Sequence, residues 1–107
     1  MTKITFYRKE NVIIGFEVSG HTGKEERGKD ILCAQISTVA QLAVVGIEEV
    51  LKLKAFREIS DGYLKIKINE KDAKEKQVQV IFETCLKSFK SIVINEEKYA
   101  KLEVKNV

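Results

Sequence analysis

The chain has 107 residues, of which 44% are apolar and 33% are charged. This balance is typical of one soluble globular domain spanning 1–107, and it excludes a disordered or fibrous protein. The formal net charge is only +3, and acidic and basic residues are interleaved, so we do not expect direct nucleic-acid binding. We find neither a secretory-signal pattern nor an apolar run long enough to predict a membrane span, and we therefore expect a cytoplasmic protein without membrane contact.

The residues that could bind metal or react are few: one histidine, His21, and two cysteines, Cys33 and Cys85. A reducing compartment favours free thiols over a disulfide between the two cysteines. Their spacing lacks the close ligand pairs and the four ligands of a zinc site. We therefore predict no metal and no other cofactor.

The first predicted element is a β-hairpin. Residues 2–8 alternate between polar and apolar side chains, residues 12–19 form a second run rich in β-branched residues, and the polar residues 9–11 connect the two. Gly15 within the second run predicts either a bulge or a close packing contact.

The periodicity ends at residues 20–30. Gly20, Gly23 and Gly28 can adopt backbone angles that are closed to other residues, and the charged residues between them would be costly to bury. We therefore expect an exposed, flexible loop. Long loops in compact domains often cover or bind a ligand, although composition by itself also fits a solvated surface loop.

Residues 31–51 carry apolar side chains at steps of three and four, which predicts a long amphipathic helix. Asp30 is well placed to cap its N-terminus. Cys33 would then lie at the third helical position, where the positive end of the helix dipole favours a thiolate. Small residues such as Ala43 would let another element pack closely against this helix.

The rest of the chain predicts a second hairpin, a second helix and a last strand. We expect the hairpin strands at 55–59 and 63–68. Asn69 or Asp72 would cap the helix, and the last strand lies within 98–107. The order ββαββαβ predicts an α+β fold, a two-layer sandwich in which two helices cover one face of a mixed or antiparallel sheet of four or five strands.

The positions of the two thiols separate their roles. Cys85 lies on the apolar stripe of the second predicted helix, so core packing accounts for it. Cys33 begins a helix beside a polar, glycine-rich loop, while Leu32 and Ile36 already supply the buried face of that helix. Cys33 is therefore a candidate nucleophile with His21 as its base. Buried cysteines and isolated histidines are also common in proteins without such chemistry.

Two further residues belong to this candidate site. Asp30 either caps the helix only or also orients the imidazole of His21 as the third member of a triad. Ser37 follows Cys33 by one helical turn on the same face, so its hydroxyl either contacts the site or binds a backbone carbonyl. Backbone N–H groups at the helix N-terminus could stabilise the oxyanion of an acyl transfer.

The residues of this region resemble the ribosomal-processing cysteine protease family, Prp. The resemblance rests on Gly-His at 20–21, the segment GKDILCA at 28–34, and Ser37. Two positions depart from the family pattern. Thr22 stands where an alanine commonly follows the histidine, and Gln35 stands where a small residue is common, which leaves the peptide preference open.

The resemblance implies Cys33 as the nucleophile, His21 as the base, and Asp30 and Ser37 as supporting residues. It implies an endopeptidase that removes the N-terminal extension of a large-subunit ribosomal protein precursor by cutting after two phenylalanines. The loop at 20–30 would be a flexible cover that becomes ordered on the substrate peptide. The resemblance also implies a homodimer, and we expect the small-residue face around Ala43 to form its contact.

Two other functions remain open. A non-catalytic, ribosome-associated domain that binds RNA or protein is compatible with the net positive charge. A redox-sensing thiol is the third alternative, although no resolving cysteine lies near Cys33 in the sequence.

Overall fold

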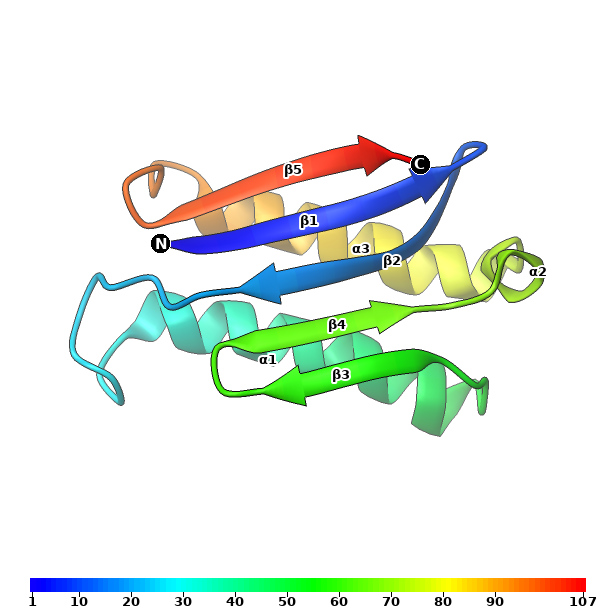
Figure 1. Ribbon diagram of the computed structural model, residues 1–107, viewed down its shortest axis with the longest axis horizontal. Helices are drawn as coiled ribbons and strands as arrows, with labels where there is room; N and C mark the ends of the chain where they lie inside the picture. Colours follow the sequence, from blue (N-terminus) through cyan, green and yellow to red (C-terminus); the bar gives the residue numbers. More distant parts are fainter.

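Alternating buried and exposed side chains produce a five-stranded sheet in the computed structural model, which describes residues 1–107 (Figure 1). The strands are β1 (Thr2–Lys9), β2 (Val12–Ser19), β3 (Phe56–Ser60), β4 (Tyr63–Lys67) and β5 (Ala100–Asn106). Their order is β3-β4-β2-β1-β5, and all neighbours are antiparallel except β1 and β5, which are parallel. The sheet is therefore mixed, and the strand boundaries differ from the predicted ones by at most two residues.

Helices cover one face of this sheet, and the other face carries none (Figure 1). α1 (Ile31–Val45) continues into a π-helical turn, η1 (Gly46–Val50), and α3 (Lys76–Val93) packs beside α1. A four-residue helix, α2 (Glu70–Ala73), is an addition to the predicted order, and Asn69 caps it. The predicted two-layer α+β sandwich is confirmed.

Four phenylalanines form the centre of the core between the two layers. Phe6 and Phe16 come from neighbouring strands and stack with their ring centroids 4.9 Å apart. Phe82 and Phe89 of α3 meet the Phe16 ring edge-on, at centroid distances of 6.2 and 5.8 Å. Such pairs contribute about 0.5–1.5 kcal/mol each beyond the area they bury. They hold α3 against β1 and β2.

Gly15 serves both purposes that the sequence predicts for it. Tyr7 pairs with Gly15 and Arg8 pairs with Ile13, so Ile14 is an extra residue that forms a β-bulge in β2. A Cβ atom at Gly15 would also collide with the carbonyl oxygen of Ile66 on β4. Only glycine allows β4 to approach β2 this closely.

Ala43 and Gly46 of the first helical segment pack within the chain. Ala43 has no exposed surface, and Gly46 lies against Ile81 of α3, where an added Cβ would be 3.0 Å from the Ile81 Cδ1 atom. The prediction that these residues permit close packing is confirmed. The prediction that Ala43 forms a dimer contact is wrong, because a fully buried side chain cannot meet a second copy.

The combined α1 and η1 segment, Ile31–Val50, is long and apolar enough to cross a membrane by length and composition alone. The sequence patterns did not indicate this, because polar residues interrupt the segment. A core helix of a globular protein passes the same test, so the observation is weak evidence for a membrane span. Four large apolar residues of this segment are exposed, namely Ile31, Leu42, Val45 and Val50.

Candidate active site

Three parts of the chain meet at one end of the molecule. The end of β2, the β3–β4 turn and the N-terminus of α1 all lie there (Figure 1). The pairing of β2 with β4 places Ser19 opposite Tyr63, and the N–H of Gly20 donates to the carbonyl of Gly62 at 2.8 Å. The backbone therefore fixes His21, which follows β2, next to the β3–β4 turn.

Asp30 caps α1, as the sequence predicts. Its Oδ1 atom accepts a hydrogen bond from the Cys33 backbone N–H at 2.9 Å. Its Oδ2 atom accepts from the Thr22 hydroxyl and, at 3.3 Å, from the Glu25 N–H. The Thr22 hydrogen bond, followed by that of the Cys33 N–H, lowers the pKa of the Asp30 carboxyl. The carboxylate therefore stays ionised at neutral pH and binds the loop to the first turn of α1.

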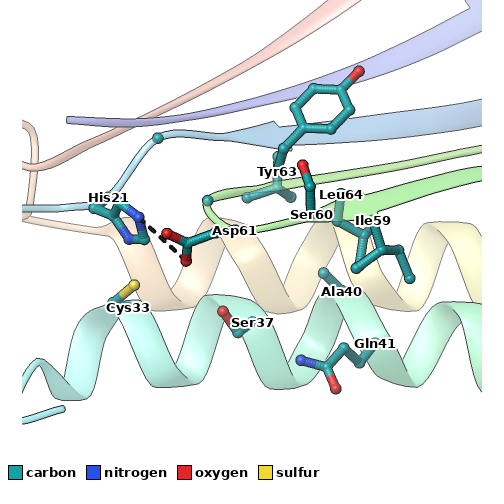
Figure 2. Close-up of a pocket in the computed structure, with 13 residues that line it drawn as sticks. His21, Cys33, Ser37, Ala40, Gln41, Ile59, Ser60, Asp61, Tyr63 and Leu64 are labelled. Carbon is teal, nitrogen blue, oxygen red and sulfur yellow. Dashed lines mark ion pairs between the residues drawn. The ribbon is translucent and has the colours of Figure 1, made fainter. Parts of the chain in front are cut away.

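The imidazole of His21 faces a different carboxylate. No hydrogen bond joins Asp30 to His21, and the Asp30 oxygens bind the donors described above. Instead, Asp61 of the β3–β4 turn places its Oδ1 atom 3.8 Å from His21 Nε2 (Figure 2). Of the two predicted roles of Asp30, the structure supports the cap and not the triad.

Cys33 and His21 face the same groove, and Figure 2 shows the thiol pointing toward the imidazole. Cys33 is the third residue of α1 and is partly exposed. The His21 ring packs over Gly62, where an added Cβ would lie 2.9 Å from Nε2. Gly62 therefore keeps this space free for the imidazole. Its φ of +69° independently favours glycine.

Two grooves meet at this pair of side chains. One groove, of about 240 Å³, runs between α1 and the β3–β4 hairpin, and Val18, Ala40, Ile59 and Leu64 supply its apolar lining. The other groove, of about 310 Å³, lies under the charged loop. His21, Cys33 and Ser37 line both. An extended chain that crosses from one groove to the other would therefore pass over the thiol.

Ser37 lines both grooves beside Cys33. It follows Cys33 by one turn and is exposed to both grooves. Its hydroxyl makes no hydrogen bond to a backbone carbonyl, whereas the neighbouring Thr38 donates to the Ala34 carbonyl at 2.8 Å. Of the two predicted alternatives for Ser37, the structure therefore supports contact with the site.

The two departures from the family pattern lie outside the grooves. Thr22 is buried, and its hydroxyl donates to Asp30, so this side chain supports the helix cap. Gln35 lines a separate surface pocket with Lys24 and Glu96. Neither side chain lines the grooves beside Cys33.

The loop between His21 and Asp30 is exposed at residues 23–29, as predicted. Gly20, Gly23 and Gly28 have φ values of +87°, +70° and +87°. Two ion pairs connect the loop to the rest of the fold: Lys24 with Glu96 at 2.6 Å, and Arg27 with Asp61 at 2.7 Å. The loop therefore lies across the site with a charged contact on each side.

Sequence patterns missed Asp61 as part of the site. It appears in the sequence only as part of an Asp-Gly turn, a common hairpin signal. Its role depends on the pairing of β2 with β4, which joins residues 44 to 52 positions apart in the sequence. No group of three His, Cys, Asp or Glu side chains lies close enough to hold a metal ion.

A partly exposed thiol in the first turn of a helix, with an imidazole facing it over a groove, is an arrangement typical of cysteine hydrolases. A family model described as cysteine protease Prp matches residues 1–101. The chain therefore belongs to the Prp family of cysteine proteases, and the resemblance seen in the sequence is confirmed. No curated protein matches in a direct comparison.

Solved structures share the fold along their whole length. SMU.848 from Streptococcus mutans is 26% identical, with a TM-score of 0.83 over 100% of this chain and 96% of that one. An essential ribosomal processing protease Prp from S. aureus, in complex with a covalently linked product peptide, is 22% identical, with a TM-score of 0.83 over 98% and 100% of the two chains. The same protease in complex with a substrate peptide gives a TM-score of 0.82 at 22% identity.

The two cysteines should differ sharply in reactivity. Burial raises the pKa of the Cys85 thiol to about 11, so this side chain stays protonated and shielded at neutral pH. We expect iodoacetamide to modify Cys33 alone in the folded protein and both cysteines in denaturant, as measured by peptide mass mapping. Equal modification of both cysteines in the folded protein would contradict this assignment.

Acid should remove the stabilisation that the Asp30 carboxylate provides. Because its pKa is lower in the folded chain than the ordinary value of about 3.9, the unfolded chain takes up the proton first as the pH falls. Asp30→Asn keeps a capping side chain without the charge. We expect the parent to exceed this variant in free energy of unfolding above about pH 5, and the difference to shrink below it.

Urea unfolding at a series of pH values measures this difference. Thr22→Val removes the largest cause of the lowered pKa, so this variant should lose part of the pH dependence and serves as an internal check. A difference between parent and Asp30→Asn that stays constant down to about pH 3 would show that the charge does not stabilise the cap.

Proposed function

We propose that this protein is an endopeptidase that removes the N-terminal extension of a large-subunit ribosomal protein precursor in the cytoplasm, cutting after two phenylalanines. Membership of the cysteine protease family supports the peptidase activity. The similarity to a ribosomal processing protease supports the choice of substrate. The observation that carries the proposal is the meeting of two grooves at Cys33 and His21.

In the proposed reaction, His21 takes the proton from the Cys33 thiol, and the thiolate sulfur attacks the carbonyl carbon of the scissile peptide bond. The negative charge then moves to the carbonyl oxygen. The N–H of Cys33 is already bonded to Asp30, so other N–H groups of the first turn would stabilise this oxyanion.

The second half of the reaction restores the enzyme. The imidazolium gives its proton to the leaving amine as the C–N bond breaks, which leaves a thioester on Cys33. His21 then takes a proton from water, the hydroxyl adds to the thioester carbon, and the C–S bond breaks. The sulfur leaves as a thiolate and recovers the proton from the imidazolium, and the N-terminal fragment leaves as a carboxylic acid.

The grooves also suggest how the peptide lies. The groove between α1 and the β3–β4 hairpin has an apolar lining that includes Ala40, Ile59 and Leu64, which suits bulky apolar side chains such as phenylalanine. The second groove runs under the loop from Gly23 to Gly28. We propose that the loop covers the peptide there and becomes ordered on it.

A peptide that spans the proposed cleavage site tests this function. The parent should cut after Phe-Phe, and Cys33→Ala or His21→Ala should lower kcat/KM by about 10³-fold or more. Cys85→Ala is the matched thiol control and should cut at the parental rate, because Cys85 lies in the core. Mass spectrometry of the fragments identifies the cleaved bond.

Two results would overturn the proposal. A Cys33→Ala variant as active as the parent would exclude the thiol nucleophile. A parent that binds the ribosomal precursor but leaves it intact would favour a non-catalytic binding domain. Replacing Phe-Phe by Ala-Ala in the peptide tests the specificity separately.

We further propose that the protein is a homodimer whose contact is the exposed apolar face of α1, η1 and α3. This face has a shallow groove without charged residues, lined by Leu42, Val45, Val50, Val80 and Ile81, among others. Leu42 and Val50 both line this groove and are exposed although they are apolar. The same face on a second copy would cover it in a two-fold contact.

Sedimentation velocity tests the dimer. We expect the parent to be a dimer at micromolar concentration, and Leu42→Glu to be a monomer that keeps the parental circular dichroism. Lys101→Glu changes an exposed residue of β5 on the opposite side of the fold and should remain a dimer. A monomeric parent, or a dimeric Leu42→Glu variant, would exclude this contact.

A further inference from the structure

Asp61 is the carboxylate that faces the imidazole in the first groove. Its Oδ1 atom lies 3.8 Å from His21 Nε2, and both residues line the groove together with Cys33 (Figure 2). The proposed reaction so far assigns Asp61 no role. Asp30 makes no hydrogen bond to His21, and its oxygens accept hydrogen bonds from the loop and the helix.

The backbone on both sides holds this arrangement in place. Asp61 lies in the two-residue turn between β3 and β4, and β4 pairs with β2 up to Ser19 and Tyr63. A hydrogen bond of 2.8 Å from the Gly20 N–H to the Gly62 carbonyl joins the end of β2 to this turn. His21 and Asp61 therefore lie next to the two ends of one short backbone contact.

The position of Asp61 distinguishes the two ring nitrogens of His21. Because Nε2 faces Asp61, Nδ1 is the nitrogen left to accept the proton of the Cys33 thiol. The imidazolium formed in this step carries N–H groups on both sides, and its Nε2 atom lies 3.8 Å from Asp61 Oδ1. A carboxylate beside this nitrogen attracts the imidazolium and restricts the rotation of its ring.

We propose that Asp61 is a positioning residue for the formation of the thioester, a role that rests on the proposed peptidase function. It holds His21 through Nε2 while Nδ1 takes the thiol proton and later gives it to the leaving amine. Arg27 of the loop binds the same Asp61 oxygen at 2.7 Å. Arg27 therefore tethers the loop to the residue that orients the base, and it competes with the imidazole for that oxygen.

Four variants test this role. Asp61→Ala removes the carboxylate, Asp61→Asn keeps its shape without the charge, and Arg27→Gln removes the tether. Glu58→Gln removes the same charge from the same hairpin but lies outside the groove. Asp61 is a turn residue with a 69% exposed side chain, so all four variants should fold, which thermal unfolding verifies.

Steady-state cleavage of the Phe-Phe peptide separates positioning from binding. We expect Asp61→Ala to lower kcat by about tenfold or more with KM within about twofold, and Asp61→Asn to fall between it and the parent. Glu58→Gln should match the parent. Arg27→Gln should raise KM without lowering kcat, because the loop loses its tether while the imidazole gains the free oxygen.

Two results would overturn the role of Asp61: an Asp61→Ala variant with parental kcat, or an Arg27→Gln variant that loses kcat to the same extent as Asp61→Ala. The second result would make Asp61 an anchor for the loop and nothing more.

Alkylation of Cys33 by iodoacetamide needs no peptide and separates this inference from the proposed function. If the parent does not cut the peptide, the proposed function fails, and the alkylation rate alone tests Asp61. A several-fold slower reaction in Asp61→Ala than in Glu58→Gln supports the positioning of His21. Equal rates in these two variants would refute it.

Discussion

The hydrogen bonds of one carboxylate, that of Asp30, hold the site together. Its two oxygens bind the Thr22 hydroxyl, the Glu25 N–H and the Cys33 N–H. These donors come from the start of the loop, its middle and the first turn of α1. Because the carboxylate is 9% exposed and satisfied on both oxygens, water competes weakly for these bonds. The cap therefore sets where the helix begins and where Cys33 lies in its first turn.

The sheet supplies the other half of the site. β2 ends next to the β3–β4 turn because β2 pairs with β4 in the sheet order β3-β4-β2-β1-β5. This pairing places His21 at the edge of the groove and Asp61 beside it. The thiol in the first turn of α1 and the imidazole just after β2 thus meet where the two layers end. The loop then closes the same end of the fold through the Arg27–Asp61 ion pair.

Local patterns predict much of this architecture, because hydrophobic period and capping chemistry are local properties. The two hairpins, the cap at Asp30 and the buried Cys85 follow from such patterns. Asp61 does not, because its importance depends on which strands become neighbours. Thr22 does not either, since its hydroxyl reaches Asp30 across eight residues of aperiodic loop.

The first helix shows a second limit of local patterns. α1 has apolar residues of its own on more than one side. The period of its sequence alone therefore does not identify the side that faces the sheet. Ala43 is buried, while its neighbour Leu42 is exposed. The helix carries two apolar faces, one for the core and one for the surface groove shared with α3. Tertiary packing decides between them, and this explains why the small-residue face proved to be internal.

The proposed activity requires that this arrangement makes Cys33 reactive through His21. The most direct measurement is the rate of iodoacetamide alkylation at Cys33 in the parent and in His21→Ala, at about pH 7 without substrate. We expect the loss of the imidazole to slow alkylation by about tenfold or more, while the fold stays intact by circular dichroism. An unchanged rate in His21→Ala would contradict this expectation.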